Sequence, residues 1–161
     1  MTLLLGFCGT FDCTIDDKGR LLIPARIHSG EFDSLKRRSI QPGETMILSL
    51  GLDGCLSLYP QEEWARIQAR VETLPFTNKD YRTVNRYLHQ YTSPVKVDRA
   101  GRILIPEKLR QKAELDKDVV VIGANQSIEI WSVKRHQEYE KDLGLKIADV
   151  AEGLFHDDHG R

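Results

Sequence analysis

The residues most able to do chemistry stand in two cationic stretches that repeat one pattern. Residues 16–20 are Asp-Asp-Lys-Gly-Arg and precede Leu-Leu-Ile-Pro, and residues 98–102 are Asp-Arg-Ala-Gly-Arg and precede Ile-Leu-Ile-Pro. The two leading aspartates are 82 residues apart, about half the chain. An arginine four residues after an aspartate has a guanidinium that can pair with that carboxylate or with an anionic group outside the protein. The pattern therefore favours a binding or structural role for the aspartate over general acid–base catalysis.

Each stretch predicts a tight turn between two strands. Aspartate at the first position and glycine at the fourth suit a type I turn, in which the carboxylate accepts backbone N–H bonds and glycine adopts a positive φ. Pro24 and Pro106 cannot donate to a strand ladder, so each is expected to end the second strand and to begin a short helix. Apolar residues predict the strands around the first turn: Phe11, Cys13 and Ile15 before it, and Leu21, Leu22 and Ile23 after it.

The turns have two interpretations. In the simpler one, each Asp–Arg pair only fixes the register of a hairpin, and exposed ion pairs of this kind contribute little stability. In the other, the duplicated unit folds into a pseudo-symmetric pair and brings two cationic turns to one face. Two copies at equivalent positions favour the second interpretation.

Charge is distributed unevenly along the chain. The 161 residues carry a formal net charge of −1, so the protein as a whole has no excess of basic residues of the kind that indicates nucleic-acid binding. Residues 96–112 nevertheless contain six basic and two acidic side chains, and residues 138–161 contain seven acidic and three basic ones. A basic face and an acidic C-terminal end are therefore expected on one molecule.

The cysteines and the apolar start of the chain predict a water-soluble protein whose thiols are reduced. The three cysteines form no C-x-x-C motif, so we expect free intracellular thiols that serve in packing. The apolar start at residues 1–7 has no basic region before it and is too short for a signal peptide or a membrane helix. We expect a cytoplasmic protein with no membrane partner, and a polar tail rather than a metal site at residues 156–161.

The rest of the chain predicts two further hairpins, each followed by a helix. Their turns are expected at residues 51–54 and 123–126, and Pro60 and Ser132 suit the starts of the helices that follow. Asn78 is expected to cap a third helix, and residues 29–45 to form a loop. A last amphipathic helix could make a subunit contact, through Ile147, Val150, Ala151, Leu154 and Phe155. We expect the first unit at residues 1–59, a helical segment at 60–92, the second unit at 93–131, and C-terminal helices with a tail at 132–161.

These motifs together resemble the MraZ family, bacterial proteins encoded at the start of the division and cell-wall gene cluster. The resemblance rests on the two D-x-x-x-R units with their apolar residues and proline. It also rests on Phe-Cys-Gly at 7–9, Leu-Tyr-Pro-Gln-Glu-Glu-Trp at 58–64, and Ile-Glu-Ile-Trp at 128–131. It covers nearly the whole chain. The start before Phe7, Tyr91-Thr92 and the tail depart from the family pattern.

The resemblance implies a fold, a partner and an assembly. The fold is α+β and mainly β, with two swapped-hairpin AbrB-like units forming a pseudo-dimer within one chain. The partner is double-stranded DNA at repeats in the promoter of the protein's own gene cluster, bound by a homo-oligomeric ring that acts as a regulator, expected to be a repressor in the nucleoid. The signature residues carried over are Asp16, Lys18, Arg20, Asp98 and Arg102, and Arg99 is added by position alone.

A mechanism follows for these residues. Arg20 and Arg102 are expected to form bidentate hydrogen bonds with guanine edges in the major groove. Asp16 and Asp98 are expected to hold the turns and to orient these two arginines. The remaining cations are expected to contact phosphate, which fixes position without recognising sequence: Lys18, Arg26, Arg99 and Arg110.

Two alternatives come from other classes of protein. AbrB-like units also occur in antitoxins, and the acidic end of this chain could bind a protein partner in place of specific DNA recognition. An enzyme is the other alternative, but the sequence contains no nucleophile elbow, phosphate loop or metal-binding spacing. We therefore expect no catalytic residue, metal, cofactor or small-molecule substrate.

Overall fold

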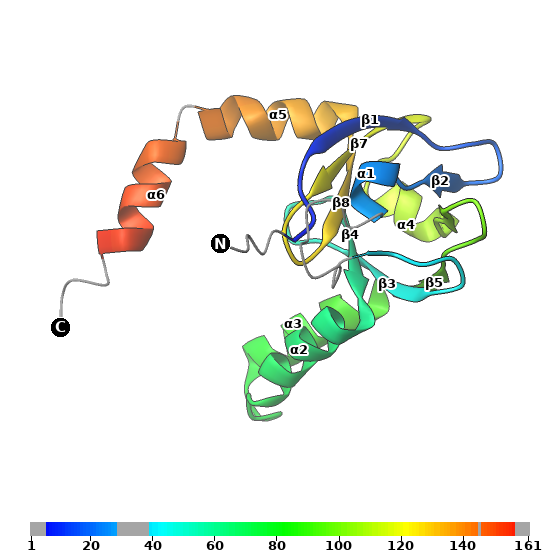
Figure 1. Cartoon of the computed structure of the whole chain (residues 1–161). Helices are drawn as coiled ribbons and strands as arrows, with labels where there is room; N and C mark the ends of the chain where they lie inside the picture. Colours follow the sequence, from blue (N-terminus) through cyan, green and yellow to red (C-terminus); the bar gives the residue numbers. More distant parts are fainter. Residues whose placement is uncertain (1–5, 29–38, 145, 157–161) are drawn as a thin grey trace, which may run out of the picture.

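The computed structural model describes residues 6–28, 39–144 and 146–156 and has an α+β fold that is mainly β (Figure 1). Residues 29–38 of the expected loop and 157–161 of the tail lie outside the described residues. The strands are β1 (Thr10–Thr14), β2 (Arg20–Leu22), β3 (Thr45–Leu50), β4 (Leu56–Pro60), β5 (Thr92–Lys96), β6 (Arg102–Leu104), β7 (Asp118–Gly123) and β8 (Ile128–Ser132). The helices are α1 (Ala25–His28), α2 (Gln61–Glu72), α3 (Lys79–Gln90), α4 (Glu107–Lys112), α5 (Val133–Gly144) and α6 (Ile147–His156).

The main sheet is symmetric with respect to the two units. Its six strands run in the order β1-β7-β8-β4-β3-β5, and β2 and β6 form a separate two-stranded ribbon. Exchanging each strand of the first unit for its equivalent in the second, β1 with β5 and β3 with β7, gives the same order reversed. The two units therefore build one pseudo-symmetric body rather than two separate sheets, and the expected pseudo-dimer is confirmed.

The strands on either side of each turn pair across units. Between the two strands that flank the first turn, the strand pairing is limited to an isolated bridge between Ile15 and Leu21, while β1 pairs with β7 and β2 pairs with β6. In the second unit β5 pairs with β3. The flanking residues were predicted as strands joined by a tight loop, and the structure shows that most of their ladder hydrogen bonds go to the other unit. This exchange is the swapped hairpin that the family resemblance implied.

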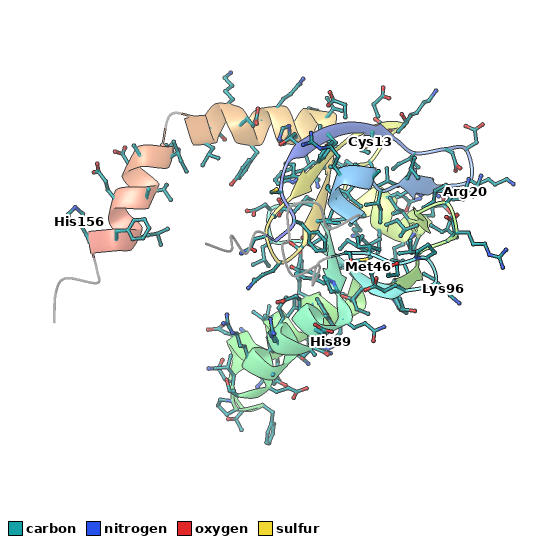
Figure 2. The ribbon with its side chains drawn as sticks, viewed as in Figure 1. Cys13, Arg20, Met46, His89, Lys96 and His156 are labelled. Atoms are coloured by element: carbon teal, nitrogen blue, oxygen red, sulfur yellow. The ribbon has the colours of Figure 1, made fainter. Side chains whose placement is uncertain are left out.

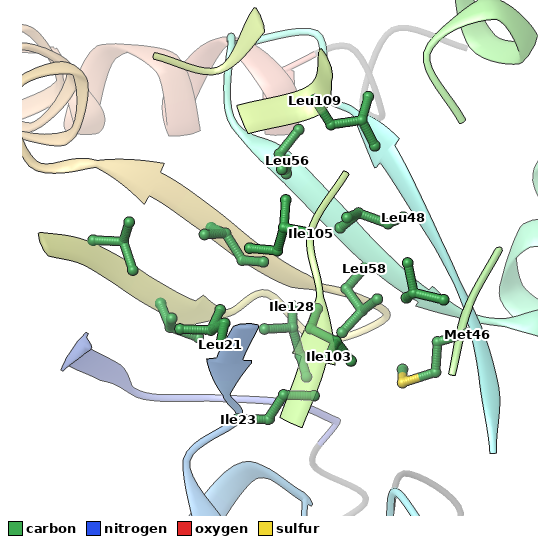
Figure 3. Packing of buried hydrophobic residues seen from close by; sticks show 14 of the residues in the cluster. Leu21, Ile23, Met46, Leu48, Leu56, Leu58, Ile103, Ile105, Leu109 and Ile128 are labelled. Atoms are coloured by element: carbon green, nitrogen blue, oxygen red, sulfur yellow. The ribbon is translucent and has the colours of Figure 1, made fainter. Parts of the chain in front are cut away.

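The ribbon of β2 and β6 marks the pseudo-twofold axis. Leu21 and Ile103 face each other at its centre, with side chains that are 1% and 0% exposed. Figure 3 shows both pointing into a cluster of buried aliphatic side chains. This core includes Ile23, Leu48, Leu58, Ile105 and Ile128. Because this cluster takes residues from both units, the two units share one apolar core.

The helices cap and extend this body. The Asn78 side chain accepts hydrogen bonds from the backbone N–H groups of Asp80 and Tyr81, and Ser132 Oγ accepts one from Arg135 N–H, so both expected caps are confirmed. Figure 1 shows α2 and α3 projecting together from one end of the sheet and α5 leading away to α6. Within the described ranges, no helix combines the length and the apolar composition needed to cross a membrane.

Candidate nucleic-acid interface

The first turn is held by one carboxylate. Asp16 Oδ1 accepts hydrogen bonds from the backbone N–H groups of Lys18 and Arg20, both at 2.9 Å. Asp16 Oδ2 accepts one from Arg20 Nε at 2.7 Å. The turn closes through Gly19 N–H on the Asp16 carbonyl, and Gly19 has a φ of +83°. Aspartate, glycine and arginine therefore each have a separate role in fixing this backbone.

The second turn repeats this geometry. Asp98 Oδ1 accepts from the N–H groups of Ala100 and Arg102 at 2.9 Å, and Oδ2 accepts from Arg102 Nε at 2.8 Å. Gly101 has a φ of +84° and donates its N–H to the Asp98 carbonyl. In both turns, backbone N–H bonds to the carboxylate are the largest influence that holds the pKa of Asp16 and of Asp98 below the ordinary aspartate value. Both carboxylates are therefore stabilised in their charged form.

The two turns are held next to each other by reciprocal hydrogen bonds. Ile105 N–H donates to the Gly19 carbonyl at 2.9 Å, and Ile23 N–H donates to the Gly101 carbonyl at 3.1 Å. Figure 1 shows both turns, between β1 and β2 and between β5 and β6, at the same side of the molecule. In Figure 2, Arg20 and Lys96 both lie at this side, away from His89 and His156. The fold thus gathers the two cationic stretches onto one face.

The arginine side chains lie at the surface rather than in the core. Arg20 is 33% exposed and Arg102 is 35% exposed. In the part of the chain that the structure describes, only Nε of each guanidinium has a hydrogen-bond partner. The carboxylate therefore fixes the direction of each guanidinium, and the two Nη amino groups remain available to a ligand such as a guanine edge or a phosphate.

Both halves of the chain match the same protein family. A family model described as "MraZ protein, putative antitoxin-like" matches residues 7–87 and again residues 89–157. The chain belongs to the MraZ family.

Curated relatives match almost the whole chain. A protein of Heliobacterium modesticaldum named transcriptional regulator MraZ is 42% identical over 149 residues, which is 92% of this chain and 96% of the relative. A protein of the same name from Desulforamulus reducens is 38% identical over 148 residues, and one from Lactiplantibacillus plantarum is 36% identical over 149 residues. The expected membership of the MraZ family is confirmed.

The other predicted cations of this MraZ family member differ in their surroundings. Lys18 and Arg99 are exposed at the tips of the first and second turns, and Arg26 is exposed on α1. Arg110, on α4 of the second unit, is half-buried and packs its guanidinium against Gly19 of the first turn: a Cβ added there would lie 3.0 Å from Arg110 Cζ. Among the described residues, Arg110 Nε is buried without a hydrogen-bond partner. Arg110 thus belongs structurally to the first turn, which its place in the sequence did not indicate.

Two leucines of the ribbon of β2 and β6 are exposed beside the arginines of the turns. Leu22 was expected among the apolar strand residues and Leu104 stands at the equivalent position of the second unit, but the two are 54% and 57% exposed. Each follows its arginine by two positions, and alternate residues of a strand face the same side. This period-two spacing was a signal that could have placed both leucines beside Arg20 and Arg102.

In the described ranges, no group of three or more histidine, cysteine, aspartate or glutamate residues is arranged to hold a metal ion. All three cysteines are free thiols. Burial is the main cause that raises the pKa of Cys55 to about 12, so its thiol stays protonated and is a poor nucleophile at neutral pH.

Proposed function

We propose that this protein is a transcriptional regulator that binds double-stranded DNA at repeats in the promoter of its own gene cluster and represses it. The observation that supports this most is the pair of equivalent turns, in which Asp16 and Asp98 hold Arg20 and Arg102 by Nε and leave both Nη groups for a ligand. The relatives named transcriptional regulator MraZ support the same class of function. In this proposal the protein is cytoplasmic, associates with the nucleoid and catalyses no reaction.

In this proposal the cations have two different roles, base recognition and phosphate binding, and their surroundings support the assignment. Arg20 and Arg102 are oriented by a carboxylate, so they suit a directional, bidentate bond to guanine O6 and N7. Lys18, Arg26 and Arg99 are exposed and suit phosphate, which needs charge more than direction. Arg110 reaches phosphate only through its Nη groups, because its Nε is buried against the first turn.

The assembly proposed is a homo-oligomeric ring. Helix α6 exposes Ile147, Val150, Leu154 and Phe155, an apolar stripe of the kind that a subunit contact covers. A ring repeats the pair of turns around its rim, so promoter repeats would be bound several times at high effective concentration. Light scattering of the wild type should give a mass of several subunits, and Leu154→Ser with Phe155→Ser should lower it. A wild-type monomer at working concentration would contradict the ring.

The binding proposal is tested by fluorescence anisotropy at fixed salt. The duplex carries the region upstream of the protein's own gene, and a shuffled duplex of the same composition measures non-specific binding. Arg20→Ala and Arg102→Ala should each weaken specific binding by about 1–3 kcal/mol, the discrimination of one bidentate contact. Arg86→Ala removes an exposed arginine of α3, away from the turns, and should bind as the wild type does. Wild-type affinity in both turn variants would refute the assignment.

An antitoxin-like protein is the second candidate, and the description of the family model as "putative antitoxin-like" favours it. In that case α5 and α6 would bind a protein partner, and the turns would have only a structural role. This candidate is preferred if the wild type binds the upstream and shuffled duplexes equally and copurifies with a small protein in stoichiometric amount.

A further inference from the structure

The ribbon of β2 and β6 presents two leucines to solvent beside the two arginines. Leu21 pairs with Ile103 at the centre, and on either side Arg20 pairs with Leu104 and Leu22 pairs with Arg102. Leu21 and Ile103 are buried in the core. Because side chains alternate between the faces of a strand, the four residues of the two outer pairs share the opposite face.

On this outer face, charged and apolar side chains alternate along each strand and across the pair. Directly opposite residues of an antiparallel pair have Cβ atoms about 4.5–5.5 Å apart, so each leucine lies next to the arginine of the other unit. Leu22 and Leu104 are more than half exposed. A single exposed leucine needs no explanation. Here, however, both pseudo-equivalent positions carry leucine, each adjacent to a carboxylate-oriented arginine.

We propose that Leu22 and Leu104 are specificity residues that contact the C5-methyl groups of thymines next to the guanines bound by Arg20 and Arg102. This inference rests on the proposed function. The major groove admits a two-stranded β-ribbon, and the thymine methyl is the apolar group that its base edges present there, beside the O6 and N7 acceptors of guanine. A surface that alternates guanidinium and aliphatic groups therefore matches a groove edge that alternates guanine and thymine.

A second copy of the chain is the competing occupant of this face. Two such ribbons stacked face to face would bring four guanidinium groups together and remove them from water, which is unfavourable without added anions. DNA supplies both the negative charge for the arginines and the apolar methyl for the leucines. The charge on the face thus favours a nucleic-acid partner over self-association.

The test compares two duplexes that differ only in thymine methyl groups. The region upstream of the protein's own gene is prepared with thymidine or with deoxyuridine, which keeps the O4 acceptor and the base pairing. The wild type should bind the uracil duplex more weakly, by about fourfold for each contacted methyl, the equivalent of exposing one CH₂-sized apolar group. Leu22→Ala with Leu104→Ala should bind the thymine duplex more weakly and lose the difference between the two duplexes.

A matched variant and two further readouts separate the outcomes. Leu52→Ala removes an exposed leucine in the turn between β3 and β4 and should keep the full uracil effect. Equal binding of both duplexes by the wild type, or the same uracil effect in the Leu22/Leu104 variant, would overturn the inference and leave DNA binding intact. A fall in oligomer mass in that variant, with the uracil effect unchanged, would assign the leucines to a contact between copies. Failure of the wild type to prefer either upstream duplex over a shuffled one would instead overturn the proposed function.

Discussion

The two turns share a frame and differ at their tips. In both, one aspartate carboxylate binds two backbone N–H groups and the arginine Nε, and a glycine at positive φ closes the turn. The tip is Asp17-Lys18 in the first turn and Arg99-Ala100 in the second. The frame is therefore determined by three residue types, while the residues between them can change without altering the backbone.

The difference at the tips changes the local charge. Residues 16–20 contain two acidic and two basic side chains, whereas residues 98–102 contain one acidic and two basic ones. The guanidinium of Arg110 packs against Gly19 and adds a cation to the less basic turn. Because the two turns share one frame, we expect Arg20 and Arg102 to have equal roles. Because the charged residues around them differ, we expect those residues to have unequal roles.

The largest expected effect tests whether the two units contribute equally to the core. Leu21→Ala and Ile103→Ala each remove a fully buried side chain at the pseudo-twofold axis. Each should lower the free energy of unfolding by about 2–5 kcal/mol, the range for cavities of this size. Urea denaturation measures both, with Leu52→Ala as an exposed control. A large loss in one variant and almost none in the other would show that the pseudo-symmetry is only geometric.

The next effect separates the strain of the turn backbone from the contact that Gly19 makes with Arg110. Gly19→Ala and Gly101→Ala both place a side chain at a φ above +80°, which should destabilise the protein by about 1–2 kcal/mol. In Gly19→Ala the added Cβ also approaches the Arg110 guanidinium at 3.0–3.3 Å, which should add an excess to this loss. Adding Arg110→Ala should remove that excess in a double-mutant cycle, and an excess that persists would contradict the contact.

A smaller effect concerns pH. The pKa values of Asp16 and Asp98 are lowered from the ordinary 3.8 in the folded protein, chiefly by backbone hydrogen bonds. The stability that they contribute is therefore present above pH 3.8 and is lost as the pH falls through their lower folded-state values. Asp16→Asn and Asp98→Asn should be less stable than the wild type at neutral pH, and in urea titrations the differences should shrink as the pH falls below 3.8. Asp17→Asn, at an exposed residue of the first turn, is the control. Differences that stayed constant with pH would argue against the charged carboxylates.

The smallest effect concerns the cation at the tip of each turn. If Lys18 and Arg99 contact phosphate, Lys18→Ala and Arg99→Ala should each reduce the slope of log affinity against log salt by about 0.9. They should weaken binding to the upstream and shuffled duplexes alike, since phosphate contacts carry no sequence information. A change in the preference between the two duplexes would instead give that residue a role in base recognition.

The local features of this fold could be predicted, and the long-range ones could not. The turns at 16–20 and 98–102 and the cap at Asn78 depend on neighbouring residues, so aspartate, glycine and asparagine at fixed positions were sufficient. The pairing of β1 with β7 joins residues more than a hundred positions apart, and only the family resemblance indicated the exchange. The contact of Arg110 with the first turn depends on that same exchange. The exposure of Leu22 could not be predicted from the apolar residues 21–23 alone, which do not show which of them faces outward; only the spacing of two residues from Arg20 indicates it.

Arg20 and Arg102 are proposed to bind guanine edges from two equivalent turns, and methylation protection with dimethyl sulfate tests this most directly. The reagent attacks guanine N7 in the major groove, where the proposed guanidinium contacts lie. The wild type bound to the upstream duplex should protect guanines at each repeat, and Arg20→Ala and Arg102→Ala should each lose protection at a different subset, while Arg86→Ala keeps the full pattern. Identical protection in the wild type and both turn variants would contradict the claim.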